Sequence, residues 1–284
     1  MRLDPGMDTY YLLGQWIAWM RSAGRPETTI GLRKYHLTRA ARELPVPLSE
    51  VTNDQLVEWL AAQAWAPATR RSYRASLVQF YRWALRSDSL SHNPAELLPP
   101  ISVPRSVPRP APEEILQAAL QAADPRARLA MLLAGQCGLR RGEIARLHTR
   151  DLEHDLFGMT LRVKGKGGHV RLVPVPADEY GLEFLLRRLD PGWAFPSPVG
   201  DHITPEHMGR IVSRALPPGW ACHTLRHRFA TTVYRATHDI RVTQELLGHA
   251  KPETTAIYTQ VAAGDMRAAV NTAAIHLHLV KDDE

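Results

Sequence analysis

Short polar clusters interrupt the apolar pattern in the second half of the chain, and they contain side chains that can do chemistry. His223 and Arg226 lie in Cys-His-Thr-Leu-Arg, His249 ends Leu-Gly-His, and Tyr258 lies in Thr-Thr-Ala-Ile-Tyr-Thr. A guanidinium group can bind a phosphate through two parallel hydrogen bonds, and a tyrosine hydroxyl can act as a nucleophile. Each cluster alone indicates little, because a histidine at a helix start is usually a cap and a tyrosine between apolar residues is usually core.

Taken together, these clusters resemble the tyrosine recombinases, or phage-type integrases. Arg140 lies in Gly-Leu-Arg-Arg-Gly-Glu, which matches the family's first arginine, with Glu143 at the accompanying acidic position. Lys166 lies in Val-Lys-Gly-Lys-Gly-Gly-His-Val-Arg-Leu-Val-Pro-Val, which is similar to the family's β-hairpin lysine segment. The remaining matches, in the family's order, are the His-x-x-Arg box, the second histidine and the nucleophile: His223, Arg226, His249 and Tyr258.

The resemblance implies a site-specific DNA recombinase, or integrase. Such an enzyme cleaves and rejoins strands through a 3′-phosphotyrosyl intermediate and a Holliday junction. In this chemistry Tyr258 attacks phosphorus, and Arg140 and Arg226 neutralise charge on the non-bridging oxygens. Lys166 protonates the departing 5′ oxygen from the hairpin turn. Because the phosphotyrosine stores the bond energy, we expect no cofactor.

The same resemblance adds His223 and His249 to the catalytic residues and assigns a supporting role to Glu143. His223 accepts a proton near the tyrosine, and His249 donates a hydrogen bond to the phosphate. Glu143 orients its neighbours rather than reacting. Lys164 competes with Lys166 for the lysine role, because side chains two residues apart point the same way in a regular strand.

Other chemistries and functions stay open at this point. Cys222, His223 and His227 could form a metal site, but no His-Glu-x-x-His or Cys-x-x-Cys pattern accompanies them, so we expect no metal. A type IB topoisomerase shares the catalytic logic, and a non-catalytic DNA-binding regulator could use the same helices. The complete catalytic set favours the recombinase over both.

Composition restricts the class of protein. The 284 residues are 44% hydrophobic and 23% charged, with a net charge of +6 and two cysteines. These values exclude a wholly disordered chain and a disulfide-stapled scaffold. Residues 1–111 contain 14 Lys+Arg and 9 Asp+Glu, so most of the positive charge lies there. We expect a cytoplasmic protein, of the bacterial nucleoid or of a host cell if phage-encoded, that binds double-stranded DNA.

Helical periodicity and a proline-rich segment predict two domains. Four helices are expected, from near Asp8 to Gly24 and over 27–42, 52–63 and 67–86. Helices follow near 113–120, 126–138, 139–147, 178–189, 204–215, 223–236, 240–247, 252–262 and 265–279, with a hairpin over 158–163 and 169–175. The fold class is therefore mainly α with a small antiparallel sheet.

We accordingly expect a helical core-type DNA-binding (SAM-like) domain over 1–98, a proline-rich linker over 99–112 and an α+β catalytic domain over 113–284. Because the first helix starts so early, we expect no separate N-terminal domain. An assembly helix over 265–280 is predicted to dock into a neighbouring protomer, the alternative being a helix folded back on its own domain. The expected assembly is a homotetramer on two specific core-type DNA sites, with monomers or weakly associated chains off DNA and a possible accessory directionality protein.

The helix over 67–86 separates an apolar face from a basic one. Tyr73, Leu77, Phe80, Tyr81 and Ala84 share one side, and the opposite side contains arginines with no carboxylate among them. A solvated face usually mixes charge signs, so this side is expected to contact DNA phosphates. With two linker arginines, the predicted DNA-binding set is Arg70, Arg71, Arg74, Arg82, Arg86, Arg105 and Arg109.

Overall fold

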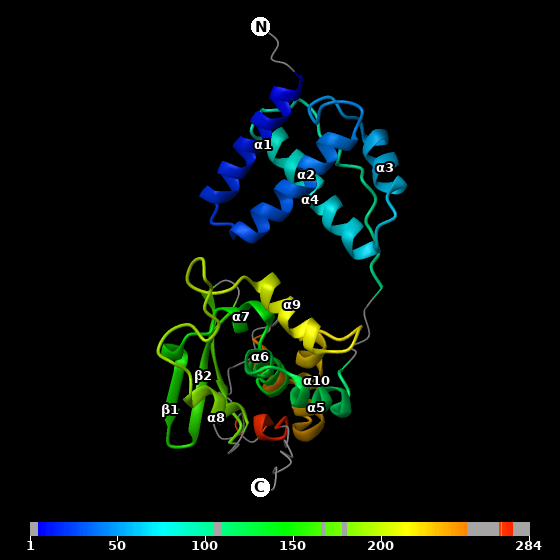
Figure 1. Cartoon of the computed structure of the whole chain (residues 1–284). Helices are drawn as coiled ribbons and strands as arrows, with labels where there is room; N and C mark the ends of the chain where they lie inside the picture. The colour runs from blue at the N-terminus through cyan, green and yellow to red at the C-terminus, as the bar shows by residue number, and fades with distance from the viewer. Residues whose placement is uncertain are drawn as a thin grey trace. The chain divides into compact units, whose positions relative to one another are not determined.

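The chain divides into two compact units, Met1–Ser106 and Val107–Glu284. The boundary falls inside the segment predicted as a linker. The structure, a computed structural model, describes residues 5–104, 110–165, 168–177, 181–248, 267 and 269–274. The mainly α fold with a small antiparallel sheet is confirmed (Figure 1).

The first unit contains the four predicted helices: α1 (Pro5–Ser22), α2 (Glu27–Glu43), α3 (Asn53–Ala62) and α4 (Pro67–Arg86). Local sequence explains two of the starts. The Thr52 side chain accepts from the Gln55 backbone while the Gln55 side chain accepts from the Thr52 backbone, and Pro67 occupies the first turn of α4. Helix α1 begins three residues before the predicted Asp8 cap.

Aromatic side chains fill the core of this unit. Trp16 of α1 and Phe80 of α4 are fully buried and meet edge to face, with ring centroids 5.3 Å apart. The apolar face predicted for α4 is buried as a whole. The arginine side of α4 therefore faces away from this core.

The second unit begins with α5 (Glu113–Ala122), α6 (Pro125–Gln136) and the short helix α7 (Arg141–Ala145). Three antiparallel strands follow in the order β1 (Leu152–Asp155), β2 (Gly158–Lys164) and β3 (Val170–Pro174). The helices α8 (Leu182–Arg187), α9 (Pro205–Ala215), α10 (Cys222–Thr237) and α11 (Ile240–Leu247) complete the elements. Strand β1 was not predicted, and the expected helix over 252–262 lies outside the described residues.

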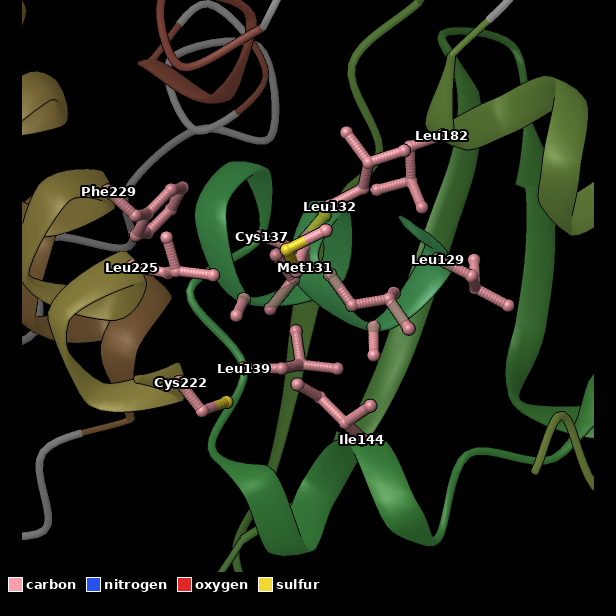
Figure 2. Close-up of a cluster of buried hydrophobic side chains, with 14 of the residues drawn as sticks. Leu129, Met131, Leu132, Cys137, Leu139, Ile144, Leu182, Cys222, Leu225 and Phe229 are labelled. Carbon is pink, nitrogen blue, oxygen red and sulfur yellow. The ribbon is translucent and has the colours of Figure 1, made fainter. Parts of the chain in front are cut away.

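Helix α6 is the centre of the second core. Its residues from Leu129 to Gln136 are all buried, and α10 packs against it. Figure 2 shows Leu225 and Phe229 of α10 facing Cys137 at the end of α6. It also shows Leu139 beside the side chain of Ile144 from α7. This packing fixes α7 and α10, which position Glu143 and Arg226 of the candidate site.

The C-terminal prediction needs correction. Arg267 and residues 269–271 are helical, but Thr272 and Ala273 form a turn, so the predicted continuous helix over 265–280 is wrong at this point. Ala269, Val270 and Ala273 are buried in the core of their own unit. These three side chains thus pack within their own domain, and the other residues of the predicted assembly helix, whose docking stays a prediction, lie outside the described residues.

No helix in the described part of the chain is long and apolar enough to cross a membrane.

Candidate functional site

A buried carboxylate lies at the centre of the candidate site. Glu143 is in the first turn of α7, and its side chain is only 3% exposed. Its Oε1 accepts hydrogen bonds from Nη1 of Arg140 at 2.8 Å and from Nη1 of Arg171 at 3.0 Å. Its Oε2 accepts from Nη2 of Arg171 and from the Arg140 backbone amide, both at 2.8 Å. Nη1 of Arg226 lies 3.9 Å from the same oxygen.

These neighbours keep the Glu143 carboxylate ionised. Burial by itself raises the pKa of this carboxyl, but hydrogen bonds from Arg171 and then Arg140 outweigh burial and lower the pKa to about 2. At neutral pH the carboxylate therefore offsets part of the positive charge that the three arginines bring together.

Arg226 of α10 is held by backbone carbonyls. Its Nη2 donates to the Leu247 carbonyl at 2.6 Å, and its Nη1 donates to the Gly138 carbonyl. Burial, and next the nearby Arg140 cation, lower the pKa of Arg226 to about 9, against the opposing effect of Glu143. The side chain is 12% exposed and still cationic at neutral pH.

Two glycines make this close packing possible. Gly138 has φ +63°, and a Cβ there would lie 2.4 Å from Cδ1 of Phe229. Gly248 has φ +60°, and a Cβ there would lie 2.9 Å from Cδ of Arg171. A side chain at either position would therefore add backbone strain and a clash. Both glycines offer their carbonyls to arginines, since Arg140 Nη2 donates to Gly248 O at 3.3 Å.

Arg140 points from this buried cluster toward a surface pocket. Its side chain is 40% exposed, much more than those of Arg171 and Arg226. The pocket lies between α7, α9 and α10, and the charged and imidazole side chains that line it are Arg140, Arg141, Arg210, Arg226, His223 and Glu206. Four guanidinium groups and one imidazole against one carboxylate make a site for an anion such as a phosphate.

The structure brings three of the predicted catalytic residues together, namely Arg140, His223 and Arg226, with the predicted supporting residue Glu143. Lys166, His249 and Tyr258 lie outside the described residues. Lys164, the rival for the lysine role, is exposed at the end of β2 and lines a second pocket that also contains Glu143. Because β2 ends at Lys164, this residue marks the point at which the chain leaves the strand for the predicted lysine turn.

Sequence reasoning missed Arg171, Arg141 and Arg210 as members of this site. Arg171 lies in the same segment as Lys166, and Arg141 follows Arg140 directly. In both cases the signal was a cation inside a recognised motif. Whether such an arginine lines the site depends on where its side chain points in the folded protein, and a sequence motif does not specify this.

The comparisons with known proteins agree with this geometry. The Phage integrase family matches residues 111–264, which is more than half of the chain. The chain belongs to this family. It is 34% identical over 221 residues to tyrosine recombinase XerC of Myxococcus xanthus, covering 69% of this chain and 72% of the relative. It is 37% identical over 239 residues to tyrosine recombinase XerC of Rhodospirillum centenum, and the match covers 76% of this chain and 69% of the relative.

The protein is therefore a tyrosine recombinase, a site-specific DNA recombinase. The names of these relatives favour that function over the topoisomerase and the DNA-binding regulator. Among solved structures it is similar to the integrase of mycobacterium phage Brujita, with 27% identity and a TM-score of 0.52. The match covers 97% of this chain and 96% of the Brujita chain. Residues 75–356 of lambda integrase share the fold at 19% identity, with a TM-score of 0.68 and coverage of 88% and 99%.

The recombinase's predicted DNA-contact arginines fall into two groups, which corrects the uniform basic face expected for α4. Arg70 Nη2 donates to the Gln63 carbonyl at 2.8 Å, and both Nε and Nη2 of Arg74 donate to the Leu98 carbonyl. These two side chains are half-buried and stabilise their own unit. Arg71, Arg82 and Arg86 are exposed, whereas Arg105 and Arg109 lie outside the described residues.

The possible metal ligands do not form a site. The His223 and His227 rings are 6.0 Å apart between centroids, and burial raises the pKa of the Cys222 thiol to about 12. Among the described residues, no group of three His, Cys, Asp or Glu side chains could hold a metal ion.

Replacing Glu143 with Gln removes the charge that balances Arg171 and Arg140. We expect this variant to be about 3 kcal/mol less stable than the wild type at neutral pH, as for a broken buried ion pair. The folded-state pKa of about 2 is below the ordinary value of 4.5. The stabilisation is therefore complete above that ordinary value and is lost as the pH falls toward 2. Calorimetry of both proteins at a series of pH values measures the difference, and a difference independent of pH would contradict this account.

Proposed function

We propose that Tyr258 is the nucleophile of a strand-transfer reaction centred on the Arg140 pocket. The tyrosine oxygen attacks the phosphorus of one phosphodiester and passes its proton to His223. The bond from phosphorus to the 5′ oxygen breaks, and Lys166 donates a proton to that oxygen. A 5′ hydroxyl from the partner strand then attacks the phosphotyrosine and gives its proton to Lys166, while Tyr258 leaves and takes its proton back from His223. Because the phosphotyrosine stores the bond energy, this cycle needs no nucleotide cofactor.

The observation that supports this proposal best is the paired arrangement of Arg140 and Arg226. Arg140 is the residue just before α7 and Arg226 lies in α10, and Glu143 lies within 4 Å of a nitrogen of each. The two guanidinium groups can therefore bind two non-bridging oxygens of one phosphate, where negative charge increases in the transition state. His249, as a further donor to the phosphate, completes the proposed set.

Strand exchange between two duplexes needs four cuts, so we propose that four protomers act on two core-type DNA sites. Lambda integrase, which shares the fold at 19% identity, has been solved as a tetramer bound to a Holliday junction. We further propose that the protein is monomeric or weakly associated off DNA, that an accessory protein sets the direction of recombination, and that the reaction takes place in a bacterial cytoplasm.

We also propose that the first unit, including its linker, is the core-type DNA-binding domain. Its exposed α4 arginines, Arg71, Arg82 and Arg86, are separate from the internally bonded Arg70 and Arg74. The exposed group contacts phosphates, together with Arg105 and Arg109 of the linker. The catalytic domain then supplies the chemistry over residues 113–284.

Replacing Tyr258 with Phe removes the attacking oxygen and should abolish the covalent protein–DNA adduct while leaving site binding intact. The measurement is a denaturing gel of protein incubated with a nicked suicide substrate, beside a gel shift for binding. Tyr234→Phe is the matched control, because Tyr234 is exposed on α10 and should leave the adduct unchanged. An adduct of normal yield from the Tyr258 variant would exclude this residue as the nucleophile.

Replacing Arg71, Arg82 and Arg86 together with Gln should weaken DNA binding without lowering the Tm. Each lost phosphate contact reduces the slope of log K against log salt by about 0.9 in B-DNA. Arg74→Gln is the comparison, since it should lower the Tm by freeing the Leu98 carbonyl. Binding titrations at several salt concentrations give the slope, and an unchanged slope in the triple variant would rule out phosphate contacts by these arginines.

A further inference from the structure

We propose that Arg171 is a positioning residue for strand cleavage, acting through Glu143 on the phosphate-binding Arg140. This inference rests on the proposed function, since it concerns the same reaction. Arg171 lies on β3, opposite Val163 on β2, and its side chain is 9% exposed. A side chain this buried does not reach DNA directly, so any effect on cleavage must pass through the groups that it contacts.

The guanidinium group of Arg171 joins three separate segments of the chain. Its Nη1 and Nη2 donate to the two oxygens of Glu143 on α7, at 3.0 and 2.8 Å. Its Nε donates to the Leu246 carbonyl near the end of α11, at 2.8 Å. The side chain itself extends from β3, the strand that follows the predicted lysine turn. One residue thus connects the hairpin, the Arg140 segment and the helix that precedes His249 in the sequence.

The bidentate contact fixes the direction of the carboxylate. With both oxygens held by Arg171, Oε1 is placed to accept from Arg140 Nη1 at 2.8 Å. The second acceptor of that guanidinium, the Gly248 carbonyl, is a longer contact at 3.3 Å. Since Arg140 is the most exposed of the three arginines, Glu143 is what restrains it, and Arg171 is what restrains Glu143.

Arg171 also fills the space beside the end of α11. A Cβ on Gly248 would lie 2.9 Å from Cδ and 3.0 Å from Nη1 of Arg171. Together with the Leu246 hydrogen bond, this packing fixes the backbone at the residue before His249. A lysine could not replace these contacts, because one ammonium group cannot span both carboxylate oxygens in a planar fork and also reach Leu246.

Loss of Arg171 should have a signature in pH that loss of packing alone does not have. The Arg171 hydrogen bond makes the largest contribution to lowering the pKa of Glu143, whereas burial raises it. Without Arg171 that pKa must rise, so protonation of Glu143 begins at a higher pH and releases Arg140. The ratio of the variant's cleavage rate to the wild-type rate should therefore fall on acidification, and taking this ratio removes any pH dependence that the chemical step gives to both proteins.

The experiment compares Arg171→Gln and Arg171→Lys with the control Arg162→Gln. Arg162 lies on β2 and pairs with Glu153 on the exposed side of the hairpin. Single-turnover cleavage of a suicide substrate at saturating protein gives the rate constant of the chemical step, and a binding titration gives Kd. Both are measured from about pH 4.5 to pH 8, because the ordinary value of a glutamate carboxyl, toward which the pKa of Glu143 moves when Arg171 is lost, lies at the acid end of this range.

We expect the Arg171→Gln variant to cleave on the order of 10²-fold more slowly, as for a misplaced catalytic group, with Kd changed less than about 3-fold. Its rate should fall further toward acid pH. The double variant Arg171→Gln/Glu143→Gln should be slow without that fall, because position 143 then has no carboxyl to titrate. If Arg171→Gln does not fold, Arg171→Lys should fold and show a smaller loss with the same direction of pH dependence.

Equal rates for the Arg171 variants and Arg162→Gln at every pH would overturn the inference while leaving the proposed function intact. A slow variant with a wild-type pH profile would also overturn it, since the role would then be structural only. If the wild-type protein forms no covalent adduct with the substrate, the proposed function fails and the inference fails with it.

Discussion

The site depends on one buried carboxylate that gathers three arginines. Without Glu143, the guanidinium groups of Arg140, Arg171 and Arg226 would repel one another in a region sheltered from water. With Glu143 present, the three cations and one anion have a net positive charge, and the exposed guanidinium group of Arg140 places part of that charge in the pocket. Burying these charges is expensive unless every one has partners, and the hydrogen bonds to Glu143 and to backbone carbonyls supply them. A bound phosphate would add the negative charge that this arrangement lacks.

The backbone is part of the same constraint. Arg226 donates to the carbonyls of Gly138 and Leu247, and Arg140 donates to that of Gly248. Both glycines have positive φ and are too closely packed for a side chain. In the motifs Gly-Leu-Arg and Leu-Gly-His, the glycine that lets the chain approach an arginine therefore stands next to or near a residue of the proposed catalytic set. The arginines in turn link the start of α7 to the N-terminal part of α10 and the end of α11, so the packing of Leu225 and Phe229 against α6 supports the pocket.

Strong periodicity explains what the sequence could predict. Helices α1 to α4 have clear apolar faces, caps or prolines at their starts, and their bounds are close to those expected. Arg140, Glu143, His223 and Arg226 were found through their motifs. Strand β1 was missed because Leu-Glu-His-Asp lacks an alternating apolar pattern, and pairing with β2 is what makes it a strand.

The remaining differences come from side-chain reach and tertiary contact. A helical projection places Arg70 and Arg74 on the basic side of α4, but a long arginine can curve back to a carbonyl, as both do. Arg171 could not be assigned from its motif because its role depends on the register of β3 against β2 and on the distant Glu143. At the C-terminal end, the spacing of Ala269, Val270 and Ala273 showed an apolar face but could not tell which core it covers.

The central claim is that Glu143 remains ionised because the arginines hold it, and the most direct test is the pKa of that carboxyl. Carbon-13 NMR of glutamate-labelled protein, with the resonance assigned by comparison with Glu143→Gln, follows the carboxyl carbon as the pH is lowered. The account predicts that this resonance stays at its ionised position well below the ordinary value of 4.5, down to the pH at which the protein unfolds. A carboxyl that titrates at or above that value would contradict it.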